Sequence, residues 1–241
     1  MWGFGCFYGR VENHKIPKMM RRMLILLALL PLFAVAAPKA TPKGTPIPNS
    51  DTIKLLAPRK SFGKNIMQAF WDRRASIDKD VRSRPIELRE LSELMWVAYG
   101  VNRDNGYLTV PSQQNAQNGE VYAILPQGAY RYDRAKHELV RVSTKDLRTL
   151  VAWQQTNAAG APLQIVIVMH PETLKVGDDE ARKRICHTEG GIVSQALSLY
   201  CAGTGLIHRP RATMDRESLR KELKLNDQAY LVMNHLVAYQ E

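Results

Sequence analysis

The pattern of hydrophobic and polar residues predicts helices and strands in alternation from residue 62 to the end of the chain. Apolar residues that recur every three to four positions mark one face of a helix, and residues 86–100 show this period most clearly. Gly100 follows as a natural end to that helix. The same reasoning predicts further helices at residues 62–74, 144–154, 178–203 and 219–223.

Strand patterns fall between these helices. Residues 121–125 and 138–142 predict two strands that pair around a turn region at 128–136. The nearly continuous apolar run at 163–170 predicts a central strand covered on both faces, and residues 229–239 predict a last strand. Helices and strands in mixed order favour an α+β fold, with helices flanking one central sheet.

The long predicted helix at 178–203 contains two features that need a physical reason. Gly190 and Gly191 are adjacent, and such a pair costs on the order of 1–2 kcal/mol inside a helix. We therefore expect either a close helix crossing or a cofactor ring that approaches the backbone. Cys186 and Cys201 would lie about 22 Å apart on one helix, which is too far for a disulfide. Buried free thiols are expected instead.

The N-terminal region predicts export. Met19-Met20-Arg21-Arg22 precedes a short apolar run at 23–37 that contains an Ala34-Val35-Ala36 cleavage signature. We interpret residues 1–37 as an N-terminal extension and signal peptide, with Met19, Met20 or Met23 as alternative starts. Residues 38–54 read as a Pro/Lys-rich linker and 55–241 as the folded domain. The mature protein would then be periplasmic or secreted, without stable membrane insertion; an uncleaved membrane anchor is the alternative.

The net charge of +11 falls to about +7 after removal of residues 1–37. The basic residues are scattered and lack the aromatic or recognition-helix patterns of nucleic-acid-binding proteins, so no nucleic-acid partner is expected. We interpret the charge as an aid to solubility and a local attraction for an anionic phosphate. Neither the cysteines nor the histidines have the spacing of a metal site, and none is predicted.

Two polar segments could carry chemistry. Arg73-Arg74-Ala75-Ser76 ends the first predicted helix and offers cations and a hydroxyl, which suit a phosphate group. It could equally be a solvated helix end whose arginines favour the helix dipole. Residues 111–117 read Pro-Ser-Gln-Gln-Asn-Ala-Gln, and their amides offer both donors and acceptors. An ordinary polar turn is the alternative there.

These segments, in this order, resemble the FMN-dependent nitroreductase family, especially the branch that includes azoline-oxidising peptide dehydrogenases. Glu189-x-Gly191-x-x-x-Gln195 on the long helix is similar to a further family pattern. The resemblance implies a nitroreductase-like fold with a mixed, mainly antiparallel sheet. It also implies FMN as cofactor, held at the positions that match the family's binding residues: Arg73, Arg74, Ser76, Lys79, Pro111, Ser112, Gln113, Asn115 and Gln155.

The resemblance further implies a homodimer, because the Pro-Ser-x-x-Asn-x-Gln loop of relatives reaches the partner's flavin. The expected function is that of an exported oxidoreductase that passes hydride or electrons through FMN to or from a small organic substrate. The protein itself needs no catalytic nucleophile, and isolated histidines are interpreted as structural. Leu108, Asp78, Ala196 and Ala238 depart from the family pattern. An exported relative that has lost flavin and acts as a binding or structural protein is therefore the alternative.

Overall fold

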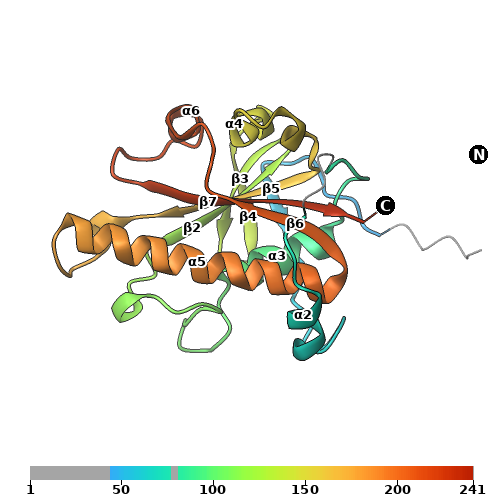
Figure 1. The fold of residues 1–241 in the computed structure, drawn as a ribbon, viewed down its shortest axis with the longest axis horizontal. Coiled ribbons are helices and arrows are strands. Elements are labelled where there is room, and N and C mark those ends of the chain that lie inside the picture. Colours follow the sequence, from blue (N-terminus) through green and yellow to red (C-terminus); the bar gives the residue numbers. More distant parts are fainter. Residues whose placement is uncertain (1–43, 77–80, 241) are drawn as a thin grey trace, which may run out of the picture. The chain divides into compact units, whose positions relative to one another are not determined.

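A seven-stranded sheet forms the centre of the computed structural model, which describes residues 44–76 and 81–240 (Figure 1). The strand order is β1-β4-β3-β2-β5-β7-β6, and each of these neighbouring pairs is antiparallel. The expected α+β architecture with a central sheet flanked by helices is confirmed. The strands are β1 (Thr52–Lys54), β2 (Gly119–Leu125), β3 (Gly128–Asp133), β4 (Glu138–Ser143), β5 (Leu163–Met169), β6 (Leu206–Arg211) and β7 (Tyr230–Tyr239).

Helices cover both faces of the sheet (Figure 1). On one face, α5 crosses the strands and packs beside α3 and α2. On the opposite face, α4 and α6 cover a second group of buried side chains that includes Leu147, Val166 and Leu219. The helices are α2 (Ile66–Asp72), α3 (Leu88–Tyr99), α4 (Arg148–Ala152), α5 (Asp179–Thr204) and α6 (Arg216–Glu222). The predicted central strand, β5, is buried at every position.

The long helix α5 is continuous through its glycine pair. A Cβ atom at position 190 would lie 2.8 Å from Cγ1 of Val232 on β7, so Gly190 allows the helix to approach the sheet closely. A Cβ atom at position 191 would have no atom within 4 Å. A close packing contact therefore explains the first glycine, whereas nothing in the described chain explains the second. Cys186 and Cys201 are buried free thiols, as predicted.

The predicted pairing of residues 121–125 with 138–142 is wrong. These segments become β2 and β4, and β3 lies between them in the sheet. Leu125 pairs with Gly128, so the chain reverses within two residues and forms a strand where only a turn region was expected. Tyr130 and Tyr132 on β3 are both buried, and this burial makes the segment part of the core.

The folded part of the chain also begins earlier than residue 55. Thr52–Lys54 form β1, which pairs with β4, and the Ile53 side chain is fully buried. The predicted linker therefore includes a strand of the sheet. Residues 1–37, and with them the predicted signal peptide, lie outside the described residues. Within the described part of the chain, no helix is long and apolar enough to span a bilayer.

Candidate functional site

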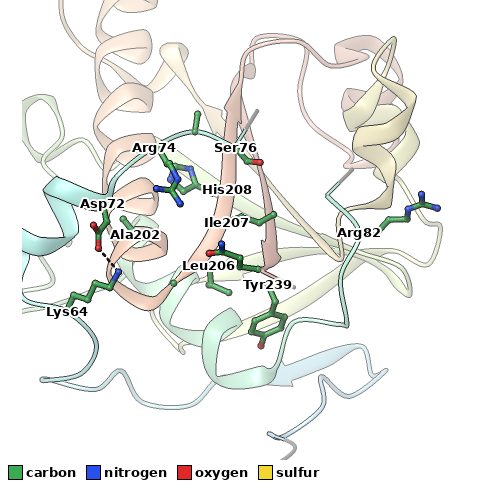
Figure 2. A pocket seen from close by; sticks show the side chains of 13 residues that line it. Lys64, Asp72, Arg74, Ser76, Arg82, Ala202, Leu206, Ile207, His208 and Tyr239 are labelled. Carbon is green, nitrogen blue, oxygen red and sulfur yellow. Dashed lines mark hydrogen bonds and ion pairs between the residues drawn. The ribbon is translucent and has the colours of Figure 1, made fainter. Parts of the chain in front are cut away.

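A cavity of about 640 Å³ opens between the ends of α2 and α5 and strand β6 (Figure 2). We call it the basic cavity, because basic side chains outnumber acidic ones around it. It is lined by Lys64, Asp72, Arg74, Ala75, Ser76, Arg82, Ala202, Gly205, Leu206, Ile207, His208, Tyr239 and Gln240. The α2 helix ends at Asp72, so the chain that follows passes along β6 and brings Arg74 and Ser76 to the cavity.

The charges of the basic cavity favour an anion. Lys64 Nζ lies 2.5 Å from Asp72 Oδ2, and this ion pair lowers the pKa of the Asp72 carboxyl (Figure 2). Asp72 thus offsets one of the three cations, Lys64, Arg74 and Arg82. The exposed Arg74 guanidinium remains to attract a phosphate monoester dianion. Cations in a partly enclosed space also attract such a group from a distance.

The backbone at Ser76 is fixed against β6. Its N–H donates to the carbonyl of His208 at 2.8 Å, and Arg209 Nε donates to the Ser76 carbonyl at 2.8 Å. These two bonds position the predicted segment from both sides. Arg73 is half-buried and does not line the cavity, whereas Arg74 and Ser76 do. Lys79, the other predicted cation, lies outside the described residues.

His208 is a buried residue of the basic cavity that sequence reasoning interpreted as structural. Only 3% of its surface is exposed, and neither Nδ1 nor Nε2 has a hydrogen-bond partner in the described chain. Burial, with a smaller contribution from the Arg73 charge, lowers the pKa of His208 to about 4. The ring is therefore neutral at pH 7. An unpartnered buried imidazole costs stability, and such groups are typical of functional sites or of positions that hold water.

The second predicted segment forms a tight loop between α3 and β2, which we call the amide loop (residues 111–117). Gln114, Asn115 and Gln117 all have positive φ angles, between 48° and 55°. Each such non-glycine residue costs roughly 1–3 kcal/mol, and strain of this kind concentrates at functional sites. Ser112 Oγ accepts from the Gln117 N–H at 2.9 Å, and Asn115 Oδ1 accepts from Gln117 Nε2 at 3.2 Å. The exposed Asn115 side chain keeps its amide donors for another partner.

Glu189 on α5 holds the amide loop by a hydrogen bond to its backbone. Its side chain is 7% exposed, and Oε1 accepts from the Gln113 N–H at 2.5 Å. Burial raises the pKa of the Glu189 carboxyl, and the hydrogen bond from the Gln113 N–H and the nearby Asn118 amide oppose that shift. Glu189 is part of the family pattern on the long helix, but the sequence spacing of that pattern did not predict a contact with the loop. Its contact with the loop joins residues 76 positions apart, so only the tertiary structure reveals it.

The amide loop and the basic cavity lie at different parts of α5. A second cavity, of about 490 Å³, lies beside the loop and α5 and is lined by Pro111, Ser112, Gln113 and helix residues as far along as Ile192. The basic cavity contacts the helix at Ala202. Glu189 and Ala202 are about 20 Å apart at the rise of an α-helix. Among the described residues, the two predicted groups of flavin contacts therefore line separate cavities.

Gln155 is not brought to either group. It is exposed, and its Oε1 accepts from Arg211 Nε at 3.0 Å. Arg211 is a buried cation that also donates to the carbonyls of Val151 and Ala152, so it caps the end of α4. In this structure Gln155 contributes to that capping network and does not line the basic cavity.

Comparisons with known proteins agree on one family. The sequence model described as the Nitroreductase family matches residues 72–239, which is most of the described chain. A candidate nitroreductase of Methanocaldococcus jannaschii is 30% identical over 161 residues, covering 63% of this chain and 81% of that protein. The residues matched by the family model include Arg74 and Ser76 of the basic cavity and the whole amide loop.

Solved structures show the same fold. The crystal structure of a candidate nitroreductase from Ralstonia eutropha has a TM-score of 0.73 and 28% identity, over 85% of this chain and 98% of that chain. A chain in the Escherichia coli microcin synthetase McbBCD complex, solved with truncated pro-MccB17 bound, has a TM-score of 0.62 and 16% identity. That match covers 96% of this chain and 85% of the other, and at this identity it indicates the fold alone.

Proposed function

We propose that this chain, which belongs to the nitroreductase family, is an FMN-dependent oxidoreductase that acts on a small organic substrate. The observation that carries the proposal is the basic cavity. It presents the exposed Arg74 guanidinium beside Ser76, at the segment where the family resemblance expects the FMN phosphate. The family membership supports oxidoreductase chemistry, and the cavity supports the cofactor.

The donor set of the basic cavity fits FMN. Arg74 is exposed and offers a planar pair of N–H donors, which suits a phosphate. Ser76 can donate a hydroxyl hydrogen to a phosphate or ribityl oxygen. The neutral His208 ring has a buried N–H without a partner, and this group is satisfied if the cofactor or a water molecule reaches it. Leu206 and Ile207 add apolar surface beside these polar groups.

A homodimer is part of the proposal, because one chain separates the two groups of contacts. If the amide loop of one copy faces the basic cavity of another, Asn115 can contact the flavin that Arg74 holds by its phosphate. The exposed face of α2 supports such an assembly. Four large apolar side chains there are between 52% and 87% exposed, and apolar patches of this kind mark protein interfaces. They are Ile66, Met67, Phe70 and Trp71.

Bound FMN would supply the redox chemistry, by accepting and returning a hydride at its N5 atom. The residues of the chain would bind and orient it. Arg74 and Ser76 would hold the phosphate, and the amide loop would offer hydrogen bonds to the ring or ribityl edge. No nucleophilic side chain is required for this chemistry.

The decisive experiment is to purify the protein and measure its absorbance in the visible flavin band. Stoichiometric FMN that is released on denaturation would support the proposal. Protein that is colourless and does not take up added FMN would refute it, and would favour the flavin-free binding protein instead. Light scattering then tests the dimer, since a flavin-loaded monomer is incompatible with a site built from two chains.

Export is a separate proposal that rests on residues 19–37. We infer a signal peptide that is cleaved near Ala36, which would place the mature protein in the periplasm or outside the cell. N-terminal sequencing of protein from fractionated cells tests this directly. A mature N-terminus near residue 37 in the soluble exported fraction is expected. An intact apolar segment in the membrane fraction would show that the alternative, a membrane anchor, is correct.

A further inference from the structure

We propose that Glu189 is a positioning residue that holds the amide loop in the shape needed to contact FMN. The inference rests on the proposed function, because it assumes that the loop is a flavin contact. Glu189 does not itself have to touch the cofactor. Its carboxyl group acts through the loop backbone at Gln113.

The contact has the geometry of an anchor. The hydrogen bond from the Gln113 N–H to Glu189 Oε1 is short, at 2.5 Å, and joins the first turn of the loop to the middle of the longest helix. The helix is fixed at this level, because Gly190 brings it against Val232 of β7. Glu189 thus connects the loop to a rigid part of the core.

The loop needs an anchor because its own conformation is strained. Gln114, Asn115 and Gln117 have positive φ angles, and only Asn tolerates this region well among these residue types. Within the loop, Ser112 Oγ and Asn115 Oδ1 each accept one bond from Gln117. Released from Glu189, the segment is expected to relax to more favourable backbone angles. Asn115 would then leave its present position.

A packing role alone does not explain a carboxyl group at this position. Glu189 Oε2 is buried and has no hydrogen-bond partner in the described chain, so a purely apolar side chain would pack at lower cost. An apolar residue would lack the acceptor for the Gln113 N–H and the polar contact with the nearby Asn118 amide, next to the loop. The structure therefore assigns Glu189 a role in holding the loop.

Three substitutions at this position separate the two roles. Glu189→Gln is neutral and keeps an acceptor of the same length, Glu189→Met fills the volume without an acceptor, and Glu189→Ala removes both. Glu180→Ala is the matched control, because Glu180 is an exposed acid on the same helix. FMN dissociation constants are measured by fluorescence, and amide hydrogen exchange is followed over residues 112–117.

We expect FMN affinity to fall about tenfold for Glu189→Met and Glu189→Ala, as for the loss of one hydrogen bond to a buried carboxyl group. Amide exchange should rise in the loop alone. Glu189→Gln should restore affinity to within about twofold of the parent, and Glu180→Ala should leave both measurements unchanged. If Glu189→Ala does not fold, Glu189→Met gives the same test.

Subunit mixing tests whether the anchor acts on the partner's flavin. Arg74→Ala chains keep an intact loop, and Glu189→Met chains keep an intact basic cavity. A mixed dimer therefore has one site with both parts intact if each site combines two chains. Recovery of tight FMN binding on mixing is the expected result. Two weak sites in every mixed dimer would overturn this arrangement.

The outcomes also distinguish this inference from the proposed function. If the parent protein binds FMN and Glu189→Met binds it equally tightly, the loop does not depend on Glu189 and the inference is wrong, while the proposed function stands. If the parent protein binds no FMN, the proposed function fails and the inference fails with it.

Discussion

The basic cavity and the amide loop show two different ways to build half of a binding site. The cavity combines residues from α2, the segment that follows it, the end of α5 and β6, and among its lining residues only Gly205 has a positive φ angle. The loop is a single run of seven residues with three strained backbone positions and one buried anchor. Ligand binding in the cavity should therefore depend mainly on charge, and ligand binding by the loop mainly on the shape of its backbone. Salt should act mainly on the first, and substitutions in the supporting core mainly on the second.

The largest expected effect comes from Arg74→Ala. A charge-assisted contact with phosphate contributes about 1.5–3 kcal/mol, so FMN affinity should fall roughly ten- to a hundredfold. The loss should shrink as salt rises, because the Arg74 side chain is exposed and its charge is screened. Fluorescence titration at two salt concentrations measures both effects.

Riboflavin, which lacks the phosphate, is the control for this variant. Its affinity should be the same for the parent and for Arg74→Ala. An equal loss for FMN and riboflavin would mean that Arg74 contacts the ring or the ribityl chain. The distinction between a cavity that binds the phosphate by charge and a loop that contacts the flavin through its shape would then be wrong.

The second prediction concerns the cost of His208 to the fold. Its pKa is lowered to about 4 in the folded state, from an ordinary value of 6.5, so the unfolded chain binds the proton more readily. Stability is thus complete above pH 6.5 and falls as the pH drops towards 4. His208→Leu should remove a loss of about 2–3 kcal/mol at pH 4. Thermal unfolding from pH 7 to pH 4 measures it.

His235 provides the comparison for His208, because burial lowers its pKa to about 3 and it stacks on His208. The destabilisation caused by protonating His235 remains in the His208→Leu variant. It sets how much stability this variant still loses as the pH falls. FMN affinity should fall in this variant while the fold becomes more resistant to acid. Equal acid sensitivity of parent and variant would show that burial of His208 carries no such penalty.

A third prediction separates the two adjacent glycines beside the loop's anchor. Gly190→Ala should destabilise the fold by about 1–3 kcal/mol, because the new methyl group would meet Val232 at 2.8 Å. Gly191→Ala meets no atom and should be neutral or stabilising, since alanine favours a helix by up to about 1 kcal/mol. Chemical denaturation measures both. Weaker FMN binding by a stable Gly191→Ala protein would indicate a partner chain or cofactor at that position.

The smallest expected effect is that of Asn115→Ala. One neutral hydrogen bond contributes only about 0.5–1.5 kcal/mol, so flavin affinity should fall by a few-fold to about tenfold. The loss should be the same for FMN and for riboflavin and should not depend on salt, in contrast to Arg74→Ala. A strongly salt-dependent loss would show that the loop lies near the phosphate.

The sequence by itself determined the elements with long, regular patterns and the segments that carry the family resemblance. Helix α3, strand β5, helix α5 and the positions of Arg74, Ser76 and Ser112 follow from period, glycine placement and local motifs. The absence of a disulfide between Cys186 and Cys201 follows from their shared helix. These features are local, because each depends on residues within one or two turns of the chain.

Only the tertiary structure decided the order of the strands, the start of the folded part and the supports of the site. β1 and β3 are short segments whose assignment depends on partners elsewhere in the sheet. The bond between Glu189 and Gln113, and the burial of His208 without partners, depend on helix and sheet packing across the whole core. Such contacts join positions far apart in the chain, so they cannot be predicted from a local sequence pattern.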